Sequence, residues 1–585
     1  MGRVKSRTGT AIFIVMALIP AIVILLSFIL PYVAAIREGL PVVASVLDED
    51  ATRRIVGFTL GQALLSTLLA LAIGLPGAWL LGSGHYRGAI WVRAIVSIPF
   101  AMPPLLVVLG FVLFFGQNGW ANRFLMSISG THVAPLEILY RPRAIILAHA
   151  FYNFPIVLRF VGEGISRART AYAHAASSLG ASGLRSFLTV FLPLSLPSVA
   201  ASAILVFLYC YTSFAVVLVL GGGPGATTLP VEIYRAARIT LDFPRAGALA
   251  LIETALAFVA YAAYVRMASI SRSISGTVDR TAQAEAGSSF HKQKKAVSTF
   301  SRLLILFYTI MILLLVLGPL LSVLLESFLP RTRQAEMLTL TFRWWKEIRT
   351  SAFPALGRSI LLAFSAATLS VCIAGSSALA VWGIRSFTKR KRWNCGRRNS
   401  SWFEKAKRRM TVRLPFAERA LAVLCAAPLA SSGIVLGLGY LRFFGSGLGR
   451  SFWAPAFAHA VSALPFAYGS ISEGLSSLAP SLAGASSSLG AQPFRTAISV
   501  ALPAAKRRIL SAWAFAVAIS LGEVNTVLML GLEDFETLPL LIYRASGAYR
   551  FGSACAAGVL LASVCVASYA LSEYADRPMK QGKGE

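Results

Sequence analysis

The chain has 585 residues, of which 56% are apolar and only 14% are charged, yet its formal net charge is +31. A soluble protein usually carries about 25% charged residues, and the mean hydropathy of +0.69 indicates a membrane protein. This composition excludes a disordered chain, a disulfide-rich secreted scaffold and a collagen-like fibre. Within a membrane protein the positive charge is expected to record topology, so we expect no nucleic-acid partner.

Twelve apolar runs are long enough to cross a bilayer, which takes roughly 20 residues per helix. In chain order they lie at about 11–35, 55–82, 90–115, 143–165, 196–221, 243–268, 301–326, 356–384, 420–445, 453–475, 509–532 and 550–573. We therefore predict an all-α, polytopic membrane protein. The first run is longer than the roughly 7 to 15 apolar residues of a signal peptide, so we expect it to remain as the first helix.

Lysine and arginine are concentrated in alternate loops. When the N-terminus is placed in the cytoplasm, the inside segments carry most of the excess positive charge, as the positive-inside rule requires. An even number of spans then places both termini in the cytoplasm. The inside loop 385–419 is more basic than topology requires, and we expect it to bind anionic lipid headgroups or, as the alternative, a cytoplasmic partner protein.

The sequence repeats one plan at an interval of roughly 310 residues. The repeated motifs include Ala148-His149-Ala150 with Ala458-His459-Ala460, Ser177-Ser178-Leu179-Gly180-Ala181 with Ser487-Ser488-Leu489-Gly490-Ala491, and Ile233-Tyr234-Arg235-Ala236 with Ile542-Tyr543-Arg544-Ala545. Each copy holds six spans, so both copies insert with the same orientation, as parallel repeats do. We assign 1–268 to the first copy, 269–300 to a polar cytoplasmic linker and 301–585 to the second copy.

One repeated cytoplasmic loop, between the fourth and fifth spans of each copy, keeps a fixed spacing. Gly180 precedes Leu192-Pro193, and Gly490 precedes Leu502-Pro503 at the same distance. Glycine permits a positive φ or the close approach of a partner's backbone, and proline suits the first turn of a helix. The spacing predicts a short amphipathic helix, a glycine turn and a further helical stretch in both loops.

The two loops resemble the coupling loop of permease subunits in binding-protein-dependent ATP-binding-cassette importers, which have the MetI-like fold. The family pattern is Glu-Ala-Ala, three residues, Gly, nine residues, an aliphatic residue, any residue and Leu-Pro. The pattern matches His174, Ala175, Ala176, Gly180, Leu192 and Pro193 in the first copy, and Gly484, Ala485, Ser486, Gly490, Leu502 and Pro503 in the second. Both copies lack the Glu, and the second has Ser in place of an Ala.

This resemblance implies that the loops dock onto two copies of a cytoplasmic ATPase, and that a periplasmic or extracellular solute-binding protein delivers the substrate. It also implies a location in the bacterial inner membrane and transport by alternating access. The chain has no Gly-x-x-x-x-Gly-Lys-Ser/Thr phosphate loop, so ATP and Mg are expected on the partner ATPase. We expect this chain itself to bind no cofactor.

Further motifs bear on the substrate. Tyr211-Thr212-Ser213-Phe214, Gly221-Gly222-Gly223-Pro224 and Phe535-Glu536-Thr537-Leu538-Pro539 resemble the fused thiamine permeases. Fused ferric-iron permeases share the two-copy plan, with a similar Leu-Gly-Glu and Thr-Leu-Pro. The expected substrate is therefore thiamine or its phosphates, with ferric iron as the alternative.

Polar residues of the fifth span in each copy are candidates for the translocation path. They are Tyr211, Thr212, Ser213, Glu523 and Asn525. The anionic group of Glu523 and the ring face of Tyr211 would suit a cation with aromatic rings. A structural role for Glu523, hydrogen-bonded to neighbouring helices, is equally compatible with its place in a span. Glu163 and Glu473 also repeat, near the cytoplasmic ends of their spans, and are candidates to brace the coupling loops or to be solvated at the interface.

Two other classes of protein remain as alternatives. An ion-coupled secondary transporter also forms parallel repeats, and it predicts broken helices with an acid pair at the midplane, but it does not explain the glycine loops. An intramembrane enzyme needs convergent nucleophiles, acids or metal ligands, which the isolated Glu253, Glu523, His149 and His459 do not supply. We therefore expect no catalytic residue and no metal site, and a hydrogen-bonding or packing role for both histidines.

Overall fold

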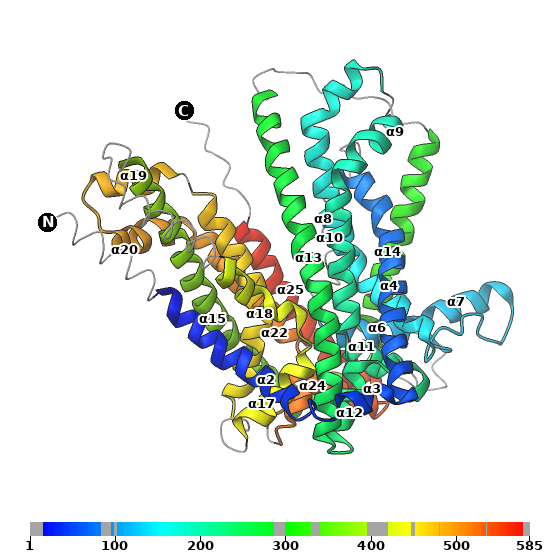
Figure 1. Ribbon diagram of the computed structural model, residues 1–585. Helices are drawn as coiled ribbons and strands as arrows, with labels where there is room; N and C mark the ends of the chain where they lie inside the picture. Colours follow the sequence, from blue (N-terminus) through cyan, green and yellow to red (C-terminus); the bar gives the residue numbers. More distant parts are fainter. Residues whose placement is uncertain are drawn as a thin grey trace. The chain divides into compact units, whose positions relative to one another are not determined.

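The computed structural model describes residues 16–82, 95–96, 98, 102–181, 183–221, 223–285, 299–329, 340–394, 419–445, 451–478, 480–533 and 535–576. Within these residues every regular element is a helix (Figure 1). Nine described helices are long and apolar enough to cross a membrane, and there are ten if the bent pair Arg419–Ala430 and Gly433–Phe444, which meet at 103°, forms one span. The prediction of an all-α polytopic membrane protein is confirmed.

The two remaining predicted spans coincide with α18 (Trp453–Ser476) and α22 (Lys506–Gly522). α18 is rich in Ala, Ser, Gly and Pro, which lowers its hydropathy, and most of its side chains are buried by neighbouring helices. α22 is 17 residues long because the chain leaves the helix at Glu523. Helices inside a membrane bundle use small residues to approach their neighbours, so they need less apolar bulk than helices that face lipid.

The helices form two compact units that are each built from both halves of the sequence. Unit 1 comprises the described residues within Met1–Arg37, Pro354–Leu538 and Ser563–Glu585, and unit 2 those within Glu38–Phe353 and Pro539–Ala562. The predicted division into 1–268, 269–300 and 301–585 stays a prediction about the sequence repeats. Helix α13 (Phe243–Glu285) continues through the first part of the predicted linker. Most of the basic loop 385–419 lies outside the described residues.

Unit 2 contains most helices of the first copy. They are α3 (Val43–Asp48), α4 (Asp50–Gly82), α6 (Pro104–Phe115), α7 (Trp120–Ser129), α8 (Pro142–Ser178), α9 (Gly183–Ser186), α10 (Leu192–Tyr211), α11 (Ala215–Leu220), α12 (Leu229–Arg238) and α13, together with α14 (Thr299–Glu326) and most of α24 (Leu538–Gly547). The centre of this unit is the packing of α4 on α8 and of α10 on α8 and α13.

Unit 1 contains most helices of the second copy. They are α17 (Gly433–Phe444), α18, α19 (Pro480–Ser488), α20 (Pro493–Thr496), α21 (Leu502–Ala504), α22 and α23 (Asn525–Leu530), together with α2 (Leu30–Arg37) and most of α15 (Arg343–Asn394). Helix α25 (Phe551–Asp576) contributes to both units through its two halves. In unit 1, α18 packs on α22 and α17 packs on α23.

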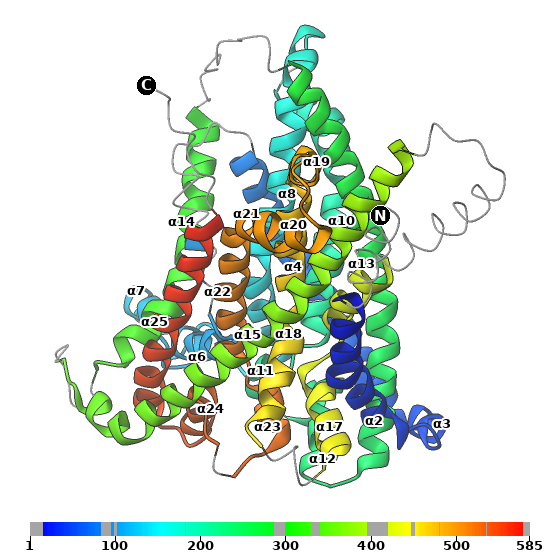
Figure 2. The ribbon, with the colours of Figure 1, turned by 90° about the vertical axis from the view of Figure 1, so that its left-hand side faces the viewer.

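The first helix of each copy packs on the other copy. In unit 1, α2 lies beside α17 (Figure 2), and a Cβ at Gly439 would overlap the Pro31 carbonyl oxygen. In unit 2, α14 packs on α6, and a Cβ at Gly110 would lie 2.6 Å from the Pro319 carbonyl oxygen. The same glycine–proline contact therefore occurs twice, and a sequence repeat that places each first helix in its own copy does not predict this exchange.

The glycine contacts predict a pair of destabilising substitutions. Gly439→Leu and Gly110→Leu each place side-chain atoms where the partner backbone lies, and overpacking of this kind costs about 1 to 3 kcal/mol or more. We expect a lower thermal midpoint and a lower monodisperse yield in detergent for both variants. Gly469→Leu is the matched control, because a Cβ at Gly469 meets no atom within 4 Å. Equal stability of Gly439→Leu and Gly469→Leu would contradict the contact.

Candidate functional site

Both glycines of the repeated loops form left-handed helix caps. The φ angle is +75° at Gly180 and +81° at Gly490. The Ala181 amide donates to the Ala176 carbonyl at 3.0 Å, and the Ala491 amide donates to the Ser486 carbonyl at 3.1 Å. These bonds have the six-to-one spacing of a Schellman cap, which uses glycine because other residues are strained at positive φ. The predicted glycine turn is therefore present in both copies.

The predicted residues around each turn lie in equivalent places. We call 174–193 the first Gly-turn segment and 484–503 the second Gly-turn segment. His174, Ala175 and Ala176 lie in the last turns of α8, whereas Gly484, Ala485 and Ser486 lie in α19. In the second segment the Ser486 and Thr496 hydroxyls are hydrogen-bonded at 2.8 Å, which joins the two sides of the turn.

Each segment then ends in a π-helical turn followed by Leu-Pro. The π turns cover Phe187–Phe191 and Ala497–Ala501, and α10 and α21 begin directly after them with Leu192-Pro193 and Leu502-Pro503. Proline has no amide hydrogen to donate to the residue four positions earlier, so the ladder widens locally. π turns are rare and often occur at functional sites, and this one occurs at the same position in both copies.

The tip of each segment presents a leucine to its surroundings. Leu179 and Leu489 immediately precede the two glycines, and each is 88% exposed. Leu179 follows a stretch of α8 that carries Arg159, Glu163, Arg167 and Arg169. Such a density of charge does not suit the hydrocarbon core, so lipid does not account for the exposure of Leu179. In the second segment Leu489 also borders a hollow of about 490 Å³ between α19 and the π turn. The same exposed apolar side chain therefore stands at the tip of both segments. The motif Ser-Ser-Leu-Gly-Ala contained this signal, but sequence reasoning singled out only the glycine.

The two segments differ in how they join the fourth span. Helix α8 runs without interruption from the span to Ser178, whereas α18 ends at Ser476 and α19 begins at Pro480. Glu163, on α8, pairs with Arg159 and Arg167 of its own helix, both at 3.4 Å. Glu473, on α18, lies 4.0 Å from Arg508 at the start of α22. The repeated glutamates thus have different partners in the two copies.

The candidate path residues lie where the fifth spans break. Helix α10 ends at Tyr211 and α11 begins at Ala215, while α22 ends at Gly522 and α23 begins at Asn525. The Tyr211 side chain is fully buried, and its hydroxyl donates to the Glu253 carbonyl at 3.2 Å. Thr212 follows Tyr211, and its hydroxyl donates to the Leu208 carbonyl of α10 at 2.9 Å.

Glu523 is held at the break by donors of unit 1. One carboxylate oxygen accepts from the Asn525 amide at 3.0 Å, and the other accepts from the amide and the hydroxyl of Thr526. The second oxygen also lies 3.0 Å from Nε2 of His459, whose Nδ1 is 2.8 Å from the Ser520 hydroxyl. The carboxylate therefore caps α23 and connects it to α18, which is the structural role that the sequence left open.

The repeated histidines both take part in hydrogen bonds between helices. Nδ1 of His149 lies 3.0 Å from the side-chain oxygen of Gln62 on α4, and the Gln62 amide donates to the Cys210 carbonyl at the end of α10. This is the hydrogen-bonding role expected for both histidines. No group of three or more metal-binding side chains is found in the part of the chain that the structure describes.

The breaks in the fifth spans bear on the ion-coupled alternative. That class of transporter predicts a broken helix with an acid pair, and the structure shows a break in both copies. Only one of these two breaks carries a carboxylate, because Ser213 stands at the position in the first copy that Glu523 occupies in the second. The broken helices therefore occur here without the acid pair.

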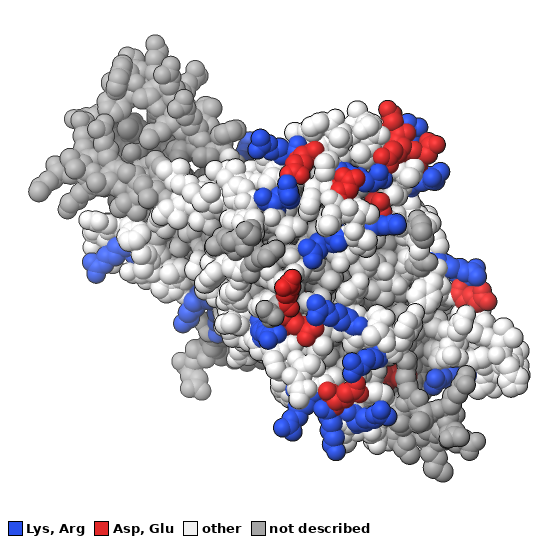
Figure 3. Space-filling view, turned by 90° about the horizontal axis from the view of Figure 1, so that it is seen from below, with Lys and Arg blue, Asp and Glu red and all other residues white. Residues whose placement is uncertain are grey.

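The end of unit 2 that holds α3, α12 and the start of α4 carries charges of both signs. Arg245 pairs with Glu49 at 2.9 Å and lies 3.9 Å from Glu232, and Arg53 pairs with Asp48 at 3.1 Å. Seen from below, basic and acidic side chains alternate over this face (Figure 3). Within unit 2 it lies at the opposite end from α9 and the first Gly-turn segment (Figure 1). We call this face the mixed-charge end of unit 2.

Comparison with known proteins gives relatives over nearly the whole chain. The "Thiamine transport system permease protein ThiP" of Haemophilus influenzae is 28% identical over 520 residues, which cover 88% of this chain and 87% of the relative. The protein of the same name from Escherichia coli is 26% identical and covers 90% of both chains. A "Putative 2-aminoethylphosphonate transport system permease protein PhnU" of Salmonella typhi is 31% identical over 39% of this chain and 78% of its own.

The family model described as "Binding-protein-dependent transport system inner membrane component" matches residues 74–334 and 411–581. The two matched stretches contain the first and second Gly-turn segments respectively, so the repeat found in the sequence is a repeat of this family's domain. The protein is thus a multi-pass, non-enzymatic membrane component of a transport system. By this match over most of its length, the chain belongs to the family of binding-protein-dependent transport system inner membrane components, the permeases of ATP-binding-cassette importers.

Proposed function

We propose that this chain forms the complete membrane channel of an importer for thiamine or its phosphates. The assignment of thiamine as the substrate rests on the similarity to two proteins named thiamine transport system permease over about nine tenths of the chain. One chain supplies both domains that match the family, which supports a channel formed without a second permease subunit.

The proposed partners are two copies of a cytoplasmic ATPase and one solute-binding protein. The two Gly-turn segments are the proposed ATPase-docking surfaces, because each presents an exposed leucine on a glycine cap of the same geometry. ATP and Mg belong to the ATPase in this proposal, and the chain binds no cofactor. Both termini lie in the cytoplasm, so the mixed-charge end of unit 2 faces the solute-binding protein.

Transport proceeds by alternating access in this proposal. Closure of the ATPase dimer displaces the Gly-turn segments, and the π turns and Leu-Pro junctions pass the movement directly into α10 and, through α21, into α22. The breaks at the far ends of α10 and α22 are the proposed points of path opening. Tyr211, Thr212, Ser213, Glu523 and Asn525 are the proposed path residues, with Glu523 acting through its fixed position beside His459.

Reconstitution tests this function. The chain is placed in proteoliposomes with its ATPase inside and its solute-binding protein outside, and uptake of labelled thiamine is measured. We expect uptake with enclosed ATP and Mg, none with ADP, and no inhibition by excess ferric ion or 2-aminoethylphosphonate. Uptake of ferric ion in place of thiamine would reassign the substrate, and thiamine uptake driven by an ion gradient without ATP would overturn the importer assignment.

A further inference from the structure

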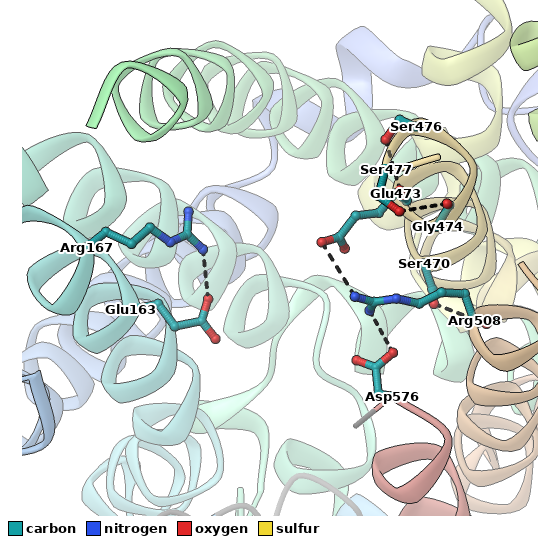
Figure 4. A network of polar contacts seen from close by, with 9 residues as sticks. All are labelled: Glu163, Arg167, Ser470, Glu473, Gly474, Ser476, Ser477, Arg508 and Asp576. Carbon is teal, nitrogen blue, oxygen red and sulfur yellow. Dashed lines mark hydrogen bonds and ion pairs between the residues drawn. The ribbon is translucent and has the colours of Figure 1, made fainter. Parts of the chain in front are cut away.

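Arg508 joins three helices at the base of the second Gly-turn segment. Its guanidinium donates to the Asp576 carboxylate of α25 at 2.6 Å and lies 4.0 Å from the Glu473 carboxylate of α18 (Figure 4). Its carbonyl accepts from the Ser470 hydroxyl at 3.3 Å. The fourth, fifth and sixth spans of the second copy therefore meet at one side chain.

The stem of Arg508 lies directly against Gly474. A Cβ at Gly474 would be 2.7 Å from Cγ of Arg508. The glycine thus provides the space in which the arginine crosses α18 and reaches α25. Arg508 and Asp576 are each about one-third exposed, so water screens their ion pair less than it screens a pair on an open surface.

The first copy makes the same three-helix junction without charge. Ser198 occupies the position that Arg508 takes in the second copy, and its hydroxyl is hydrogen-bonded to that of Ser271 on α13 at 2.7 Å. A Cβ at Gly164 would lie 3.1 Å from the Ser198 hydroxyl. The corresponding glutamate, Glu163, is paired within α8 instead.

The difference coincides with the difference in helix continuity. The first Gly-turn segment continues α8, so a displacement of its tip moves the fourth span as one rigid body. The second segment is separated from α18 between Ser476 and Pro480, where a displacement can be absorbed. Arg508 connects the end of α18 to the start of α22, so the two helices that flank the second segment are held together despite this break.

We propose that Arg508 is a positioning residue for coupling, which transmits movement of the second Gly-turn segment to the fourth, fifth and sixth spans of its copy. In the first copy the unbroken α8 passes a displacement of the Gly-turn segment to the fourth span. In the second copy the charged clamp formed by Arg508, Asp576 and Glu473 has this role. This inference rests on the proposed function, because it presumes that the ATPases move both segments.

The test measures the number of thiamine molecules imported per ATP hydrolysed in the reconstituted importer. We expect Arg508→Ala to lower this ratio roughly tenfold, within the usual range of coupling between sites, while ATP hydrolysis continues. Ser198→Ala is the matched control in the first copy, where we expect less than about a twofold change because a single hydroxyl pair is lost. Gly474→Ala displaces the stem of Arg508 and should lower the ratio as well.

Charge exchange separates positioning from general stability. Arg508→Asp combined with Asp576→Arg re-forms an ion pair between α22 and α25, and we expect it to recover part of the ratio that either single change loses. If Arg508→Ala does not assemble, Asp576→Asn, which keeps the shape of the side chain, takes its place in the measurement. An unchanged ratio in the assembled variant, or equal losses for Arg508→Ala and Ser198→Ala, would overturn the clamp. Absence of ATP-driven uptake by the unaltered chain would instead overturn the proposed function.

Discussion

Replacing Gly180 and Gly490 together by aspartate is expected to abolish ATP-driven uptake while the chain still inserts into the membrane. Both glycines have positive φ, which most residues adopt only at a cost of roughly 1 to 2 kcal/mol, but aspartate is among the few that visit this region. A Cβ at either position meets no atom within 4 Å. The turns should therefore keep their shape, and the added carboxylates lie on the proposed docking surfaces beside Leu179 and Leu489.

The measurement compares uptake, co-purification of the ATPase and monodisperse yield of the permease. We expect uptake to fall to the level of vesicles that contain ADP, with the yield preserved. Gly130→Asp is a matched control. Gly130 also has a positive φ of +67°, a Cβ there would meet no atom within 4 Å, and it follows α7, which lies away from the first Gly-turn segment within unit 2 (Figure 1). Full uptake by the double variant, or equal loss of uptake by the Gly130 variant, would contradict the assignment of the docking surfaces.

The single substitutions carry further information, because the two Gly-turn segments are joined to their spans differently. Gly180 lies on a turn that continues an unbroken helix, and Gly490 lies on one that follows a break. Equal losses from the two single changes would mean that docking limits transport at both sites. A larger loss at Gly180 would mean that the continuous α8 transmits most of the movement.

Features encoded within a few residues could be predicted from the sequence, and contacts between distant helices could not. The apolar runs gave the positions of the spans because bilayer thickness sets their length, and the glycine spacing gave the positive φ at Gly180 and Gly490. The apolar runs at 453–475 and 509–532 also indicated the two spans that are short or weakly apolar, α18 and α22. Local chemistry thus determined where each element lies along the chain.

The contacts that sequence reasoning missed depend on which helices become neighbours. The exchange of the first helices depends on Gly439 meeting Pro31 and Gly110 meeting Pro319, and neither pair is close in the sequence. In the sequence, Arg508 is one of many basic residues near a predicted cytoplasmic loop. A comparison of the two copies contained one signal for it, since Gly164 and Gly474 repeat whereas Ser198 and Arg508 do not.

Removing the Glu523 carboxylate is expected to have the largest effect of any single substitution in unit 1. In Glu523→Ala, the Asn525 and Thr526 amides lose their acceptor and His459 loses its partner. Each buried donor left unpaired costs about 1 to 3 kcal/mol. The native protein carries only a modest margin of stability, so we expect a strongly reduced thermal midpoint and little assembled permease.

Glu523→Gln distinguishes the structural role from direct contact with the substrate. The Gln carbonyl oxygen can accept from the Asn525 and Thr526 amides. Its NH₂ group can donate to the Thr526 hydroxyl, which then acts as an acceptor, and to Nε2 of His459 when that ring carries its proton on Nδ1 and donates to the Ser520 hydroxyl. We therefore expect near-normal stability and near-normal uptake from this variant. Normal stability with a raised KM for thiamine-loaded binding protein would show that the negative charge itself acts in the path. If Glu523→Ala is as stable as the unaltered chain, the cap on α23 is dispensable. The connection from α18 through His459 to the break in the fifth span would then contribute nothing to folding.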